Sequence, residues 1–212
     1  MHHNTNVFLN HLIKYRLIYF FMIVLFLVGI IFGAIIVNSM TFIQKTDLFF
    51  YLDQFMNRLL EGPIVDNQDM FKTTFLYHLQ YLGLFFILGL SVIGLPIIWI
   101  LMFVKGVVVG FSVGFFVNQL GWKGFVFAAA SIAPQNIFII PVYLLASSIA
   151  MIFSLALLQK IFSRKIQQPT AQPFLQYVVV FLLFVCVAAV AAIVETFISN
   201  QAMELVISWM YN

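Results

Sequence analysis

Long stretches without a charged side chain are the feature that most restricts how this sequence folds. A helix that crosses a lipid bilayer needs about 20 consecutive apolar residues. Charge-free runs occupy residues 17–37, 79–104, 106–120, 137–158 and 174–194. With 64% hydrophobic and 8% charged residues, the chain has more apolar surface than a water-soluble domain of 212 residues buries. We therefore predict an all-α fold, a polytopic transmembrane helix bundle of about five spans that forms a single integral membrane domain over residues 1–212.

Weak helix formers and isolated charges set the predicted ends of these spans. Gly94-Leu95-Pro96 lies near the end of the second span, and Lys105 is interpreted as the turn into a short third span. The first run follows Lys14 and Arg16, as the core of a signal peptide would. It ends without a small-x-small cleavage pattern, so we interpret it as a retained helix. Cys186 is the only cysteine, and no disulfide is expected.

The Lys and Arg residues predict the orientation, since those in short loops stay in the cytoplasm. A cytoplasmic N-terminus places six of them inside and four outside. The inner set is Lys14, Arg16, Lys105, Lys160, Arg164 and Lys165, and the outer set is Lys45, Arg58, Lys72 and Lys123. All seven carboxylates then lie outside, and the C-terminus with them. The basic residues form no stripe along one face, which argues against a nucleic-acid partner.

An odd number of spans leaves residues 125–135 on the outer side, between two crossings. Nine helical residues rise only about 13 Å, less than half of the hydrocarbon core. We therefore expect a short re-entrant or interfacial segment there. Pro134 suits the first turn of the next helix, and the amides of Gln135 and Asn136 suit backbone groups left free at the turn. The alternative is that this polar seam of Pro134, Gln135 and Asn136 is a binding site.

The longest polar stretch, residues 39–75, is expected to be an outer loop. Within it Leu48, Leu52, Phe55 and Leu59 recur at three- and four-residue spacing, with polar side chains on the opposite face. This pattern predicts an amphipathic helix. It is typical both of a helix that rests on the bilayer surface and of one that binds a protein partner outside the membrane, and the sequence does not choose between them.

Catalytic motifs are scarce. Gly110-Phe111-Ser112-Val113-Gly114 matches the G-x-S-x-G pattern of many hydrolases, but the serine needs a base. His78 is expected at the outer rim and Ser112 near the inner face, a vertical gap of roughly 20 Å. Metal-ligand arrays and cofactor fingerprints are absent from the sequence, so no cofactor and no enzymatic activity are expected.

Glycine spacing explains the same segment as a packing surface. Gly106, Gly110 and Gly114 recur every four residues, and Gly29 and Gly33 repeat the spacing in the first span. Small residues on one face let two helix backbones approach closely in lipid, where the hydrophobic effect no longer drives helix association. We therefore expect these five glycines at helix–helix contacts, within the chain or with a second copy of it.

A small transporter or channel is the alternative function. Broken helices near the midplane often form substrate sites, and Gly94-Leu95-Pro96 and Pro134-Gln135-Asn136 are two candidates. The distribution of charge argues against it. Apart from Lys105 at a turn and His78 at a rim, no ionisable residue is expected at membrane depth, where such residues mark most ion pathways.

Four stretches carry a resemblance to a known family. They are VGIIFGAIIVNSM at 28–40, SVIGLPIIW at 91–99, KGVVVGFSVGFFVNQLGWKGF at 105–125 and APQNIFIIPV at 133–142. The third is the most specific, because it joins the glycine spacing to Asn118-Gln119 and Gly121-Trp122. On these stretches the chain resembles stage II sporulation protein M of endospore-forming Firmicutes, in register over nearly its whole length.

The resemblance implies a membrane anchor that acts when the mother-cell membrane engulfs the forespore. It implies a multi-pass protein of the sporulation septum and the engulfing mother-cell membrane, grouped with the stage II sporulation proteins D and P, which cut and trim peptidoglycan. The expected function is a scaffold that recruits these wall hydrolases without being one. Members of the wider superfamily carry Pro-His-Gly-x-x-Glu where this chain has Pro134, Gln135, Asn136 and Ile139. That titratable pair is missing here, so no proton or ion role is carried over from those relatives.

Overall fold

The computed structural model describes residue 10, residues 12–61, 67–163 and 171–199, and residues 203, 205, 206, 208 and 209. These residues form helices and contain no strand, which confirms the predicted all-α fold. The helices are α2 (Arg16–Ser39), α3 (Phe42–Glu61), α4 (Asn67–Gly89), α5 (Gly94–Ser131), α6 (Ala133–Ser163) and α7 (Ala171–Val194), and the five-residue π-helix η1 (Glu195–Ser199) continues α7.

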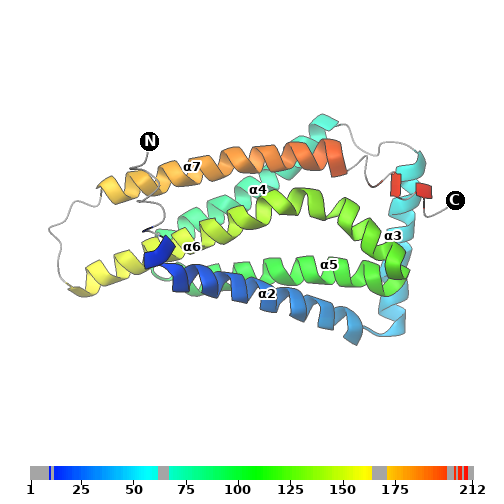
Figure 1. Ribbon diagram of the computed structural model, residues 1–212, viewed down its shortest axis with the longest axis horizontal. Helices are drawn as coiled ribbons and strands as arrows, with labels where there is room; N and C mark the ends of the chain where they lie inside the picture. Colours follow the sequence, from blue (N-terminus) through cyan, green and yellow to red (C-terminus); the bar gives the residue numbers. More distant parts are fainter. Residues whose placement is uncertain are drawn as a thin grey trace.

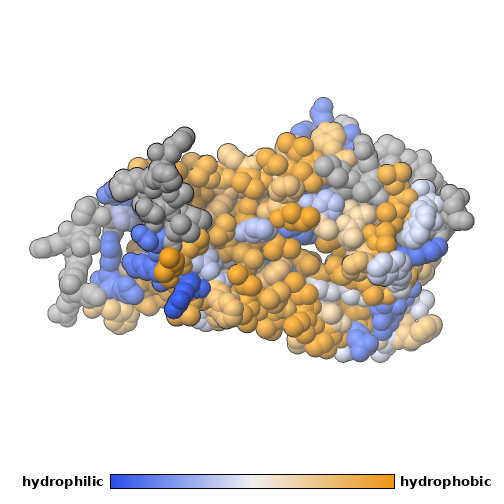
Figure 2. All heavy atoms as spheres, viewed as in Figure 1, coloured by the Kyte–Doolittle hydropathy of each residue, from blue (hydrophilic) through white to orange (hydrophobic). Residues whose placement is uncertain are grey.

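Helices α2, α4, α5, α6 and α7 lie side by side, and α3 crosses one end of the bundle (Figure 1). Four segments are long and apolar enough to span a membrane: Arg16–Ser39, Gly94–Ser131, Asn136–Phe162 and Gln172–Phe197. Helix α4 is more polar and is not among the four, but it packs against α5, α6 and α7. Figure 2 shows a broad apolar face between two ends with hydrophilic side chains, as expected for a bundle that has lipid as its solvent.

The second expected span is two helices. Residues 79–104 do not form one crossing, because α4 ends at Gly89 and α5 begins at Gly94 after a four-residue turn. Gly94 is required at this turn, since a Cβ there would overlap the carbonyl of Leu88. The turn is also held from α6, where Ser154 donates a hydrogen bond to the Ser91 carbonyl at 2.8 Å. Pro96 then falls in the first turn of α5, where its missing N–H costs nothing.

The next reversal occurs at Gly121 and not at Lys105, which corrects the expected spans 79–104 and 106–120. Gly121 has φ 59°, a left-handed conformation that glycine adopts without steric cost. It divides α5 into a long arm, 94–120, and a short arm, 122–131. The short arm folds back on the long one, since the Phe116 and Phe127 rings meet edge to face at 5.0 Å between centroids.

The short arm leads directly into α6 through a bend at Ile132 (Figure 1). Residues 125–135 therefore form the end of the short arm and the start of α6, which together make one bent return path. Three of the side-by-side helices, α2, α4 and the long arm of α5, precede Lys123, the same number as the predicted crossings 17–37, 79–104 and 106–120. Three of the largest buried side chains, Tyr143, Phe85 and Met22, lie where α2, α4 and α6 meet the long arm of α5.

Candidate functional site: a polar cavity inside the bundle

Lys105 lies inside the bundle, in the long arm of α5, about 16 Å along the helix axis from Gly94. Its side chain is only 8% exposed. The ammonium group faces the rings of Tyr77, Tyr81 and Tyr143 at 4.9, 5.0 and 5.1 Å from their centroids. It also lies 3.4 Å from the Tyr77 hydroxyl, as a long hydrogen-bond donor. Contacts of this kind with ring faces are worth about 2 kcal/mol when desolvated, so the three rings offset part of the cost of burying the charge.

Three helices build this aromatic enclosure. Tyr77 and Tyr81 are one helical turn apart on α4 and so share a face, with ring centroids 5.4 Å apart. Tyr81 stacks on Tyr143 of α6, again at 5.4 Å. Lys105 enters from α5 between them. In the sequence of α5 alone, the charge of Lys105 suggests a loop. In the structure this side chain is enclosed by tyrosines that lie 24 to 38 positions away along the chain.

His78 lies beside the enclosure and is 3% exposed, so the expected position at an outer rim is wrong. Its Nδ1 atom is 2.8 Å from the Tyr143 hydroxyl, a hydrogen bond between two buried side chains. Its Nε2 atom is 3.8 Å from a carboxylate oxygen of Glu195, the first residue of η1. This nitrogen has no hydrogen-bond partner among the described residues. Most buried polar atoms in folded proteins have a hydrogen-bond partner, so this nitrogen calls for an explanation.

A cavity of about 350 Å³ joins these groups. Its lining comes from α4, α5, α6 and η1, and comprises Thr73, Thr74, Tyr77, His78, Lys105, Val108, Val109, Ser112, Ile132, Asn136, Ile139 and Glu195. The helix directions order these residues. Thr73 of α4, Ser112 of α5 and Asn136 of α6 lie toward the end covered by α3, whereas Lys105 and the tyrosines lie deeper. Ionisable residues at such depth in a membrane bundle are costly and are commonly functional.

Ser112 lines the same cavity as His78, so the expected 20 Å gap between them is wrong. The gap was derived from a membrane surface at Lys105, and Lys105 is buried. Shared lining does not make a catalytic pair, however. The two nitrogens of His78 face Tyr143 and Glu195, and neither is hydrogen-bonded to Ser112 in the described structure.

The five glycines lie where α2 crosses the long arm of α5. A Cβ at Gly29 would meet the Phe103 carbonyl, and one at Gly33 would meet the Val107 carbonyl. From the other side, a Cβ at Gly106 would meet the Phe26 carbonyl. Gly110 likewise lies against Ile30. Gly114 lies against Ala34 less tightly, since a Cβ added there would be 3.3 Å from the Ala34 Cα. Backbone approach of this kind is available only to residues without a side chain.

The polar seam begins α6. Pro134 is in its first turn, and Asn136 donates a hydrogen bond from Nδ2 to the Ile132 carbonyl at 2.7 Å. The side chain of Gln135 lies outside the described residues. Asn136 also lines the cavity, so the seam stabilises a bend and contributes a polar group to the site.

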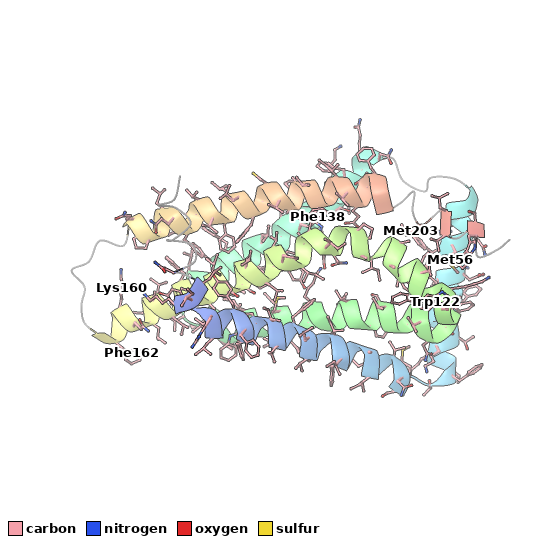
Figure 3. All side chains as sticks on the ribbon, viewed as in Figure 1. Met56, Trp122, Phe138, Lys160, Phe162 and Met203 are labelled. Atoms are coloured by element: carbon pink, nitrogen blue, oxygen red, sulfur yellow. The ribbon has the colours of Figure 1, made fainter. Side chains whose placement is uncertain are left out.

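The apolar face of α3 is turned toward the bundle. Leu48, Leu52 and Phe55 face Phe111, Phe115 and Phe116 of α5 across a second cavity of about 310 Å³. Leu52 also packs against the buried pair Met56 and Phe127, with Met203 and Val206 of the C-terminal region beside them (Figure 3 labels Met56 and Met203). The side chain of Leu59 lies outside the described residues. The most exposed apolar side chains of α3 are others, namely Phe42, Ile43, Phe50 and Tyr51.

The described residues contain no cluster of three or more His, Cys, Asp or Glu side chains that could hold a metal ion. In the comparisons with known proteins, the family model described as Stage II sporulation protein M matches residues 22–200. No curated protein and no solved structure matches the chain.

Proposed function

Because this chain belongs to the stage II sporulation protein M family, we propose that it anchors peptidoglycan-remodelling proteins to the septal membrane during forespore engulfment. The family match runs from α2 to the end of η1 and covers most of the bundle. Together with the apolar helices it makes the chain a sporulation-related membrane protein. The anchoring role and the septal location are the proposal.

The observation that carries this proposal is the placement of α3 across one end of the bundle (Figure 1). Leu52 and Met56 of its inner face pack against Phe116 and Phe127 of α5, whereas Phe50 does not line this contact and is 59% exposed. Aromatic side chains of this kind are common anchors at protein interfaces. Phe50 is not part of the sequence-based partner surface, of which Leu48, Leu52 and Phe55 lie on the inner face.

The proposed orientation keeps the N-terminus in the cytoplasm and puts α3 and the C-terminus outside. With Lys105 buried, the charge count loses one inner residue but keeps its direction, five basic residues against four. An external α3 faces the cell wall, where hydrolases act. The stage II sporulation proteins D and P are therefore the proposed partners. The surrounding lipid bilayer and a second copy of the chain are the other contacts to expect.

A site-specific crosslinking experiment tests this proposal. A photoactivatable amino acid replaces Phe50 in one strain and Ile31 in another. Ile31 is a matched control because it is 61% exposed on α2, where lipid is the expected neighbour. Illumination during engulfment should join the Phe50 variant, but not the Ile31 variant, to the D or P protein. Lipid adducts alone at both positions would refute the partner surface on α3.

We also propose that the chain is not an enzyme. Ser112 has no base bonded to it in the described structure, so the Ser112→Ala variant is expected to complete engulfment at the wild-type rate. Time-lapse microscopy of membrane migration measures that rate. A block in engulfment with normal protein abundance would contradict the proposal and favour a serine hydrolase.

Small-solute transport is a second candidate function, and the buried cluster around Lys105 is the observation that favours it. The two broken-helix sites that the sequence suggested differ in this respect. Asn136 lines the cavity, whereas Gly94 and Pro96 lie at the far end of α5 and do not. Solute flux into liposomes that contain only the pure protein would support transport. An anchor requires no such flux.

A further inference from the structure

The cavity beside Lys105 contains one charge of each sign. Lys105 and Glu195 are the only Lys, Arg, Asp or Glu residues in its described lining, and their formal charges are opposite. The net charge of the site is therefore zero. Burying an uncompensated charge in an apolar bundle is expensive, so a ligand that preserves this balance is favoured over one that changes it.

The charge balance separates the classes of ligand. A simple anion would bind at Lys105 but leave the site with a net charge of −1, and a simple cation would bind at Glu195 and leave +1. An uncharged solute keeps the balance but makes no ionic contact with either group. A zwitterion keeps the net charge of the site at zero and places a group of opposite charge at both Lys105 and Glu195. Because charge-assisted hydrogen bonds then form at both ends of the ligand, this arrangement is the strongest.

The positions of Lys105 and the other polar side chains would orient such a ligand within the cavity. Lys105 lies at the deep end with its three tyrosines, about 10 Å along α5 from Ser112. The hydroxyl groups of Thr73 and Thr74 and the amide of Asn136 lie nearer the end covered by α3. A ligand carboxylate would lie at Lys105 and an ammonium group toward Glu195. His78 Nε2, buried and without a partner among the described residues, adds a polar contact between them.

Volume limits the size of the ligand. A cavity of about 350 Å³ holds roughly twelve water molecules at about 30 Å³ each. That is room for a solute of about ten non-hydrogen atoms, the size of a small free amino acid rather than of an oligopeptide. Val108, Val109 and Ile139 supply the apolar part of the lining, which suits a short aliphatic side chain.

We propose that this cavity is a binding site for a small zwitterionic amino acid, with Lys105 binding its carboxylate and Glu195 its ammonium group. The site goes beyond the anchoring function and does not depend on it. It requires binding, not transport. The ligand class follows from the charges and volume of the cavity, and the chemistry that recognises it is present in the described residues of α4, α5, α6 and η1.

The test uses the purified full-length protein in lipid nanodiscs and radiolabelled alanine as the probe. Saturable binding is expected. Acetate and methylammonium, which each carry one of the two charges, should compete about tenfold or more weakly than unlabelled alanine, because each meets only one of the two charged side chains and changes the net charge of the site. Crosslinking at Phe50 reports on the anchoring function separately, so failure of one proposal is distinguishable from failure of the other.

Two substitutions locate the site. Lys105→Met keeps the length of the side chain and removes its charge, and it should abolish alanine binding. Lys72→Met is the matched control, since Lys72 is a 67% exposed residue of α4 that pairs with Asp69 on the surface. It should bind alanine like the wild type. If the Lys105 variant fails to fold, Glu195→Gln is the second variant, and it should weaken alanine binding about tenfold or more.

Three results would overturn the proposal. The first is the absence of saturable alanine binding to the folded wild-type protein. The second is competition by acetate as strong as that by alanine, which would make the cavity an anion site. The third is equally strong competition by methylammonium, which would make it a cation site. All three are measured on the wild-type protein, so the outcome does not depend on how the variants fold.

Discussion

Among the five glycines at the contact of α2 with α5, Gly110 is the position where an added methyl group should disturb the packing most. A Cβ there would overlap the Ile30 carbonyl oxygen and lie 2.7 Å from the Ile30 Cα. Ordinary contact begins near 3.4 Å, so the shortfall at that atom is about 0.7 Å. The obstruction is backbone and not the end of a flexible side chain. Helix α2 must therefore move as a body in the Gly110→Ala variant.

The expected cost follows from that movement. Adding a methyl group to a well-packed contact costs about 1–3 kcal/mol. The shift of α2 would also loosen the contact of Gly29 with Gly106 one turn away, so we expect a value near 2 kcal/mol. This corresponds to a roughly thirtyfold fall in the ratio of folded to unfolded protein.

Two further glycines calibrate the measurement. In Gly114→Ala the new methyl group would lie 3.3 Å from the Ala34 Cα, so a small local shift suffices and the expected cost is under about 1 kcal/mol. Gly83→Ala is the matched control, because nothing lies within 4 Å of a Cβ at this position of α4. It should not destabilise the protein by any steric route.

The assay is equilibrium unfolding of the purified variants in mixed micelles of dodecylmaltoside and dodecylsulfate, followed by tryptophan fluorescence and circular dichroism. The free energies of unfolding should rank in the order Gly83→Ala, Gly114→Ala and Gly110→Ala, from most to least stable. Equal stability of the Gly83 and Gly110 variants would refute the close contact between α2 and α5 on which the expected ranking rests.

The same unfolding assay checks three other changes. Gly121→Ala should cost about 1 kcal/mol through backbone strain alone, since φ is 59° and no atom lies within 4 Å of a Cβ; a neutral effect would place the chain reversal elsewhere. Tyr143→Phe should cost about 1–3 kcal/mol, because it removes the hydroxyl at 2.8 Å from the buried Nδ1 of His78, and stability equal to the wild type would disprove that bond. Tyr177→Phe should cost less, about 1 kcal/mol, because the Phe86 carbonyl that its hydroxyl contacts at 3.0 Å also has a helical partner; a larger loss than for Tyr143→Phe would contradict that ranking.

The fold class could be predicted because lipid imposes a length and composition on any helix that crosses it. The run at 17–37 corresponds to α2 within two residues at each end, and the runs at 137–158 and 174–194 lie within α6 and α7. The glycine spacing pointed to a face of α5, and the structure supplies what that face contacts. None of these inferences required knowledge of which helices are neighbours.

The turn positions and the cavity could not be read in the same way. A lysine between two apolar runs suggests a loop unless its aromatic neighbours are known, and Tyr77, Tyr81 and Tyr143 come from other helices. The local signals were nevertheless present. Gly94 is typical of the loop before a helix, and Pro96 two residues later is typical of the first turn of that helix. Tyr77 and Tyr81 are four residues apart and so share a helix face. Their meaning depends on long-range contacts.

The separation of α2 from its main partner along the chain sets an order of assembly. Gly29 and Gly106 are in contact, yet they are synthesised about 80 residues apart. At 5–20 residues per second the ribosome needs roughly 4–15 s to make that distance. We expect α2 to enter the bilayer during this interval, with its glycine groove facing lipid tails. The groove therefore remains open to any other newly made helix until α5 arrives to fill it.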